Sequence, residues 1–103
     1  MPTTKPIFLG RYSPAYAGDV EDFAIDVSAD LAADETLSSV ALTVANAAGT
    51  EQVGAVTSQT VTSPRVDYRM TVPSTAGTYT ITAVCTMSDS RELTYMAQLP
   101  VVS

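Results

Sequence analysis

Alternation of apolar and polar positions is the strongest pattern in this chain, and it is clearest over residues 78–87. The apolar side of the alternation is formed by Tyr79, Ile81, Ala83, Cys85 and Met87. The positions between them are threonine, with Val84 as the exception. A period of two over ten residues predicts a β-strand with one buried face. Tyr79 enters this strand just after Gly77, an arrangement typical of the tyrosine corner of Greek-key sandwiches.

The same period of two recurs along the rest of the chain. It predicts further strands over residues 20–31, 37–45, 66–72 and 93–99. Residues 51–62 are less regular and predict a short edge strand, a bulge and a crossing loop. Turns are expected at residues 46–50, 73–77 and 88–90, and a connection of at most one helical turn at 32–36. Strands at about ten-residue spacing, without a sustained helical period, predict an all-β, Ig-like Greek-key antiparallel β-sandwich of about seven strands.

The first 18 residues differ from the rest in composition. They contain Pro2, Pro6, Pro14, Gly10 and Gly18. These residues exclude a helix, so we expect an extended arm with a short edge strand over residues 5–9. The predicted organisation is an extended N-terminal arm, residues 1–18, followed by one Ig-like β-sandwich domain, residues 19–103.

Charge is sparse and unevenly distributed. Charged residues make up 16% of the chain, and the formal net charge is −6. Residues 12–64 contain eight acidic residues and no basic one. An acidic domain disfavours nucleic acid and anionic membranes as partners. We expect the acidic stretch to be a solvated face; the alternative is a contact with a basic surface of a neighbouring subunit.

No segment of the sequence indicates export or membrane insertion. There is no run of 18 apolar residues, as a membrane-spanning helix would need. The first residues lack the apolar stretch of a secretory signal. The chain is therefore expected to stay in the cytoplasm in which it is made.

Side chains suited to catalysis or to metal binding are scarce. The chain has no histidine and one cysteine, which argues against a zinc site and a Cys–His pair and excludes an intrachain disulfide. Cys85 lies on the apolar side of its strand, which predicts a buried, unreactive thiol. The best candidates for a calcium site are Asp19, Glu21, Asp22 and Asp26, but the favoured interpretation is acids paired with Thr or Arg on a strand face. We expect no enzyme activity, no cofactor and no metal.

Candidate interface residues come from the N-terminal segment and from the acidic strand after it. They are Lys5, Phe8, Arg11, Tyr12, Tyr16, Asp22 and Asp26. Exposed tyrosines beside prolines are common at protein interfaces. The alternative is that the three aromatic rings cover the domain's own core. Further along, Arg65, Asp67 and Arg69 share one face of a predicted strand, where pairing of their charges is expected.

Two parts of the sequence resemble a pattern found in small Ig-like tailed-phage virion proteins, the phage fibre–tail adaptor family. Residues 22–40 contain an acidic-aromatic strand, then Asp-Leu-Ala-x-Asp-x-Thr over residues 30–36, then a Leu-x-Ser strand. The family pattern has one more residue between the first Asp and the Leu-Ala pair. Residues 77–82 read Gly-Thr-Tyr-Thr-Ile-Thr, and a turn and an Arg-containing strand ending at Pro100-Val101 follow. The likeness covers residues 14–102. Ser90 stands where family members usually have glycine, which implies another turn type at that hairpin.

The resemblance implies a non-enzymatic structural protein of a bacteriophage virion. It would be an adaptor that joins tail or portal-region proteins to fibres, present in multiple symmetric copies and assembled in the host cytoplasm. Its partners would be other virion proteins: tail, portal-region, fibre or capsid. The pattern defines no functional residues, so none are assigned from it. Two alternatives stay open: a capsid decoration protein, and an Ig-like module of a bacterial surface adhesin.

Overall fold

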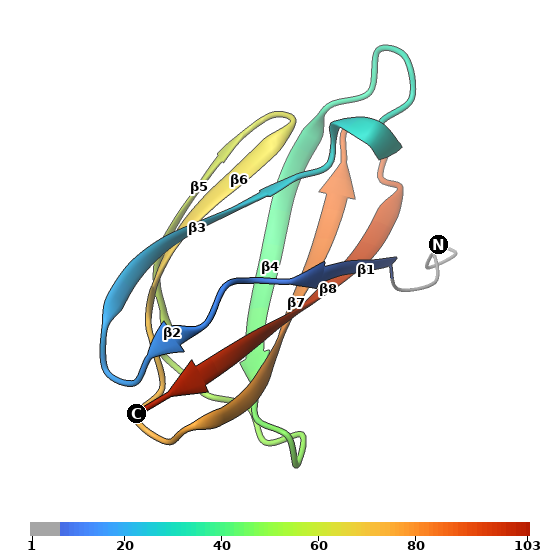
Figure 1. Ribbon diagram of the computed structural model, residues 1–103. Helices are drawn as coiled ribbons and strands as arrows, with labels where there is room; N and C mark the ends of the chain where they lie inside the picture. The colour runs from blue at the N-terminus through green and yellow to red at the C-terminus, as the bar shows by residue number, and fades with distance from the viewer. Residues whose placement is uncertain (1–6) are drawn as a thin grey trace.

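The computed structural model describes residues 7–103 and is almost entirely β-structure in that range (Figure 1). Its elements are β1 (Ile7–Arg11), β2 (Ala15–Tyr16), β3 (Val20–Asp26), a short 3₁₀ helix (Ser28–Asp30), β4 (Leu37–Ala45), β5 (Val56–Thr62), β6 (Arg65–Thr71), β7 (Gly77–Met87) and β8 (Glu92–Val102). The predicted all-β class is confirmed.

The strands form two sheets that pack face to face (Figure 1). One sheet has the order β1-β8-β7-β4, with β2 also paired to β8, and the other has the order β3-β6-β5. The chain passes between the sheets from β2 to β3, from β3 to β4, from β4 to β5 and from β6 to β7. The expected two-layer sandwich is therefore present. The expected antiparallel pairing holds except at β1 and β2, which run parallel to β8.

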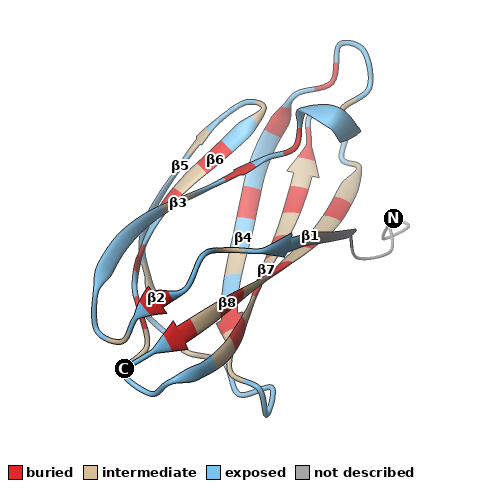
Figure 2. Cartoon of the chain, viewed as in Figure 1, coloured by how far each residue is buried: buried red, intermediate tan, exposed pale blue. Residues whose placement is uncertain are grey.

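The inner faces of both sheets build one hydrophobic core. Every second residue of β7, from Tyr79 to Met87, is buried, as the alternation predicted (Figure 2). The antiparallel register sets these residues beside those of β8, which alternates in the same way from Leu93 to Val101. The opposite sheet contributes mainly β6, whose Val66 and Met70 are completely buried. Cys85 lies within this core, as predicted.

The predicted tyrosine corner is present at the start of β7. The Tyr79 hydroxyl donates a hydrogen bond of 2.7 Å to the carbonyl oxygen of Thr75, four residues upstream. Gly77, between the two, has a φ of +152°, which a residue with a Cβ rarely adopts. The hydroxyl therefore ties the buried start of β7 to the loop that arrives from the other sheet.

Replacement of Tyr79 by Phe removes this hydrogen bond and retains the ring. We expect the free energy of unfolding to fall by about 1 kcal/mol, the usual net value of one hydrogen bond. Urea denaturation followed by circular dichroism measures the difference. Tyr16→Phe is the matched control, since Tyr16 is 64% exposed and its loss of a hydroxyl should leave stability unchanged. Equal effects of the two substitutions would contradict a role for the corner.

The strand predicted over residues 20–31 ends earlier than expected. Strand β3 stops at Asp26, and Ser28–Asp30 form the 3₁₀ helix. The Asp26 side chain accepts a hydrogen bond from the Ser28 backbone nitrogen at 2.8 Å, and such local side-chain bonds compete with strand pairing. A helical turn was expected at residues 32–36, and the structure has it earlier, at Ser28–Asp30.

Residues 7–16, predicted as part of an arm, lie in the five-stranded sheet. Strand β1 pairs with Tyr95–Gln98, and β2 pairs with Val101 and Val102. Ala15 is buried in the core. The backbone is extended, as expected, but the predicted division at residue 18 does not separate this segment from the sandwich. Residues 1–6 lie outside the described residues.

The predictions for the middle of the chain agree with the structure. The Asn46 side chain accepts hydrogen bonds from the backbone nitrogens of Ala48 and Thr50, and Gly49 has a φ of +87°, so the predicted turn is present. The chain then crosses to the other sheet. Strand β5 is an edge strand with a register shift between Val56 and Ser58, which is the expected bulge.

Candidate functional site

The structure describes six of the seven candidate interface residues, and it spreads them over one side of the sandwich and the outer face of β3. Lys5 lies outside the described residues, and Phe8 lies in β1, where it pairs in register with Met96. Arg11 and Tyr16 are exposed on the strands that pair with β8. Asp22 and Asp26 are exposed on β3, and Tyr12 is half-buried between the two sheets.

Tyr12 closes the gap between the sheets at this side. Its ring meets that of Phe23 edge to face at 5.1 Å, and Phe23 stacks on Tyr68 at 5.4 Å. The Tyr12 hydroxyl donates to the carbonyl oxygen of Ala24 at 3.1 Å and accepts from the Tyr68 hydroxyl at 3.1 Å. Burial raises the pKa of Tyr12 and of Tyr68. For Tyr12, the expectation that the ring covers the domain's own core matches its position.

Paired charges cover the outer face of the three-stranded sheet. Arg69 forms an ion pair of 2.8 Å with Asp22, and the Arg69 side chain lowers the pKa of that carboxyl. Arg65 contacts Asp67 at 2.6 Å. Asp26 lies opposite Arg65 in register, and its pKa is lowered chiefly by the hydrogen bond from Ser28. This is the predicted pairing of strand-face acids with arginines; exposed pairs of this kind contribute little to stability.

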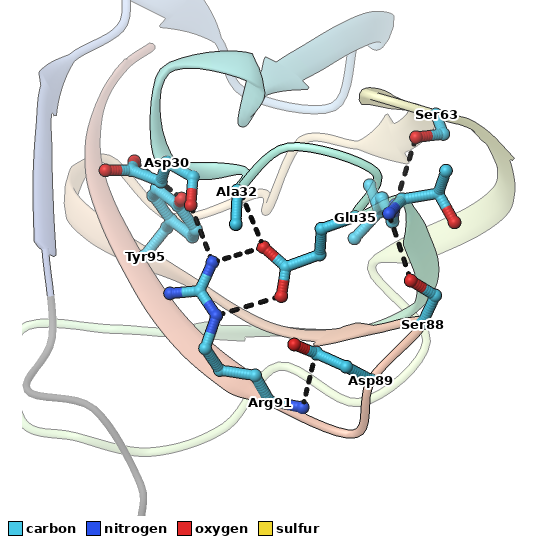
Figure 3. A network of polar contacts seen from close by, with 10 residues as sticks. Asp30, Ala32, Glu35, Ser63, Ser88, Asp89, Arg91 and Tyr95 are labelled. Carbon is cyan, nitrogen blue, oxygen red and sulfur yellow. Dashed lines mark hydrogen bonds and ion pairs between the residues drawn. The ribbon is translucent and has the colours of Figure 1, made fainter.

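The largest polar cluster was not predicted from the sequence. It joins the loop before β4 to the turn between β7 and β8, and we call it the Glu35–Arg91 network (Figure 3). Its members are Asp30, Ala32, Glu35, Asp89, Arg91 and Tyr95. Glu35 is the one buried charged residue among those described. The two ends of its central ion pair are 56 residues apart, so no local sequence signal connects them.

Arg91 makes a two-pronged contact with Glu35. Its Nε donates to Glu35 Oε2 at 3.0 Å and its Nη2 to Oε1 at 2.5 Å. The Arg91 guanidinium holds the pKa of the Glu35 carboxyl at about 2, with help from the Ala32 backbone nitrogen at 2.8 Å. Arg91 also donates to the carbonyl oxygen of Asp30 at 2.6 Å, and the Tyr95 hydroxyl donates to the Asp30 carboxylate at 2.7 Å. The network therefore fastens three segments to one another.

The turn next to this network departs from an expectation. Ser90, where a glycine would be typical of the resembled family, has a φ of +70°. This left-handed conformation is the one that glycine favours, so the serine alone does not imply a different turn type. Asp89 supports the turn by accepting a hydrogen bond from the Arg91 backbone nitrogen at 3.1 Å.

The network is built to hold segments together. No buried side-chain nitrogen or oxygen in residues 7–103 lacks a hydrogen-bond partner.

The described part of the chain contains no group of three potential metal-ligating side chains. Burial raises the pKa of the Cys85 thiol to about 11, so it is not a thiolate at neutral pH. None of the helices described in this structure is long and apolar enough to cross a membrane.

Exposed apolar side chains gather where β2 meets the end of β8. Tyr16 is 64% exposed and Val102 is 40% exposed, and the two are partners in the β2–β8 register. Their neighbours Ala15 and Val101 point inward and are buried. Tyr16 and Val102 therefore share the outer face of the sheet at this edge.

No protein-family model matches the chain, and no curated protein matches it.

Proposed function

We propose that this protein is a non-enzymatic structural protein of a bacteriophage virion, an adaptor that joins tail or portal-region proteins to fibres. The observation that carries the proposal is the resemblance of residues 22–40 and 77–101 to the phage fibre–tail adaptor pattern. The proposal fits a molecule whose polar groups are used for holding its own loops and strands in place.

The arrangement of the two resembling segments supports this proposal. Residues 22–40 include Asp30 and Glu35, and residues 77–101 include Arg91 and Tyr95. These four side chains meet in the Glu35–Arg91 network (Figure 3). Two stretches that lie far apart in the sequence are thus parts of one three-dimensional unit, as a resemblance that extends over a single domain requires.

The surface also suits an adaptor. Tyr16 and Val102 offer an exposed apolar contact at one edge, and aromatic residues are enriched in the buried centres of interfaces. Arg11 lies exposed on the neighbouring strand β1. A weak contact of this size gains avidity when many copies bind one symmetric particle. We therefore assign the docking surface to the β2 edge.

Particle composition tests the proposal. Particles are purified from cells infected by a phage whose genome contains this gene, and the proteins of the particles are identified by mass spectrometry. We expect the chain in several copies per particle, with immunogold label at the tail or portal region. Label over the whole head would favour capsid decoration instead, and absence of the chain from particles would refute a virion role.

A charged substitution at the docking surface should reduce incorporation. Tyr16→Asp places a carboxylate at the centre of the proposed contact, and we expect at least about a tenfold lower copy number, as for loss of an aromatic anchor. Thr43→Asp is the control, since Thr43 is exposed on β4, the strand at the opposite edge of the same sheet. Normal incorporation of Tyr16→Asp would move the docking surface elsewhere and leave the virion role untouched.

A further inference from the structure

The two long sides of the sandwich differ in charge. One side is formed by β1, β2 and β3, which contain Arg11, Glu21, Asp22 and Asp26. The other side is formed by β4 and β5, and neither Leu37–Ala45 nor Val56–Thr62 contains a charged residue. The sixteen residues of these two strands, nine in β4 and seven in β5, contain no charge in a chain of net charge −6. Glu51, which bridges Ala45, lies at the end of β4.

Strand β5 is the more open of the two neutral edges. Proteins usually protect an edge strand with charges, proline, a bulge or a cover. Residues 56–62 contain no charge and no proline, and their bulge lies at the start, between Val56 and Ser58. On β4, the carbonyl oxygen of Val40 is satisfied by the Gln59 side chain at 2.7 Å. No side-chain hydrogen bond among the described residues reaches the β5 backbone from Ser58 to Thr62.

We propose that β5 is a self-association edge, at which two copies of this chain pair their β5 strands antiparallel about a twofold axis. Each three-stranded sheet β3-β6-β5 would then continue into that of its partner. The choice of a second copy rests on charge: two chains of net charge −6 repel each other over most approaches, but the β5 edges bring together only Ser, Thr, Gln and Val. An antiparallel pair of identical strands is self-complementary, as a twofold interface requires.

Cross-strand contacts at this interface would come from hydroxyl side chains. Ser58, Thr60 and Thr62 are exposed and alternate along one face of β5. Hydroxyl pairs between neighbouring strands stabilise a sheet, whereas like charges directly opposite each other destabilise it. Thr60 lies in the middle of the regular part of the strand, so a new charge at this position would most directly weaken the proposed pairing of two β5 strands.

The register of the sheet supplies a matched pair of variants. Asp67 on β6 is flanked by Ala24 on one edge strand and Thr60 on the other, and both side chains are exposed. Thr60→Lys and Ala24→Lys therefore add the same charge beside the same residue, one at each edge. Each lowers the magnitude of the net charge from 6 to 5, so non-specific repulsion decreases equally in both.

Sedimentation of the purified chain tests the proposal. We expect a concentration-dependent dimer for the wild type and for Ala24→Lys, and a dimer at least about fivefold weaker for Thr60→Lys, because two lysines would then face each other across the axis. Amide hydrogen exchange should slow with rising concentration in residues 58–62 and not in β3. A wild type that stays monomeric up to about 1 mM, equal effects of the two lysines, or protection at another strand would each overturn the proposal. No phage component is needed, so the result is independent of the virion role.

Discussion

Replacement of Arg91 by Ala is expected to lower the melting temperature at pH 7 by roughly 10 °C, since it leaves a buried carboxylate without its partner. The Glu35 side chain is 3% exposed and can find no substitute for the guanidinium in water. The same substitution removes the hydrogen bond to the carbonyl oxygen of Asp30. The loop before β4 and the turn before β8 would then lose their charged contact and keep the two hydrogen bonds between Thr36 and Ser88.

The effect of Arg91→Ala should depend on pH in a defined direction. Arg91 lowers the pKa of Glu35 from its ordinary 4.5 to about 2 in the folded protein. A depressed carboxyl pKa contributes stability that is complete above 4.5 and is lost as the pH falls towards 2. The difference in melting temperature between wild type and Arg91→Ala should therefore shrink over this interval, as scanning calorimetry can measure.

Arg69→Ala is the matched control for this prediction. Arg69 also pairs with a carboxylate, but its side chain is 55% exposed and that of Asp22 is 70% exposed. Exposed pairs of this kind contribute little, so the melting temperature should change by no more than about 3 °C. If both arginines have the same small effect, the Glu35–Arg91 network does not hold the loops together.

Tyr68→Ala is expected to reduce the free energy of unfolding by about 4 kcal/mol, the usual cost of deleting a buried aromatic side chain. Tyr68 is 2% exposed, stacks on Phe23 and donates a hydrogen bond to Tyr12. Its ring therefore supports both the core of β6 and the closure of the sandwich by the N-terminal segment. A loss of this size is a large part of the stability of a small domain.

Tyr68→Phe separates the two contributions. It keeps the stacked ring and removes the hydroxyl, so we expect a loss of about 1 kcal/mol. Urea denaturation compares both variants with the wild type, and hydrogen exchange in β1 and β3 reports whether the N-terminal segment has come loose. A loss of less than about 2 kcal/mol for Tyr68→Ala would show that the site collapses around the missing ring and does not depend on it.

A rigid sandwich with distinct edges is consistent with both proposals. The β2 edge presents Tyr16 and Val102, and the β5 strand is free of charge, so the two proposed contacts use different surfaces. The two edges lie on opposite long sides, at the ends of different sheets. The two interactions can therefore be abolished separately, by Tyr16→Asp and by Thr60→Lys.

The sequence by itself was sufficient to predict the fold class, the core face of β7 and the tyrosine corner. In a strand the side-chain direction alternates with each residue, so the buried set from Tyr79 to Met87 follows from local geometry alone. The same holds for the turn at Asn46, whose side chain bonds to backbone only two and four residues away. Pairing with an opposite charge on a strand face was expected for Arg69 and for Asp22. The sequence did not show that these two residues pair with each other.

Only the tertiary structure decided which distant segments meet. The parallel pairing of β1 and β2 with β8, the burial of Glu35 beside Arg91 and the place of Tyr12 between the sheets all join residues more than 50 positions apart or on different sheets. Such contacts depend on the path of the whole chain, whereas periodicity reports only the direction of each side chain from its own backbone. For the same reason, the neutral character of β4 and β5 was visible in the sequence, but their position together on one side of the sandwich was not.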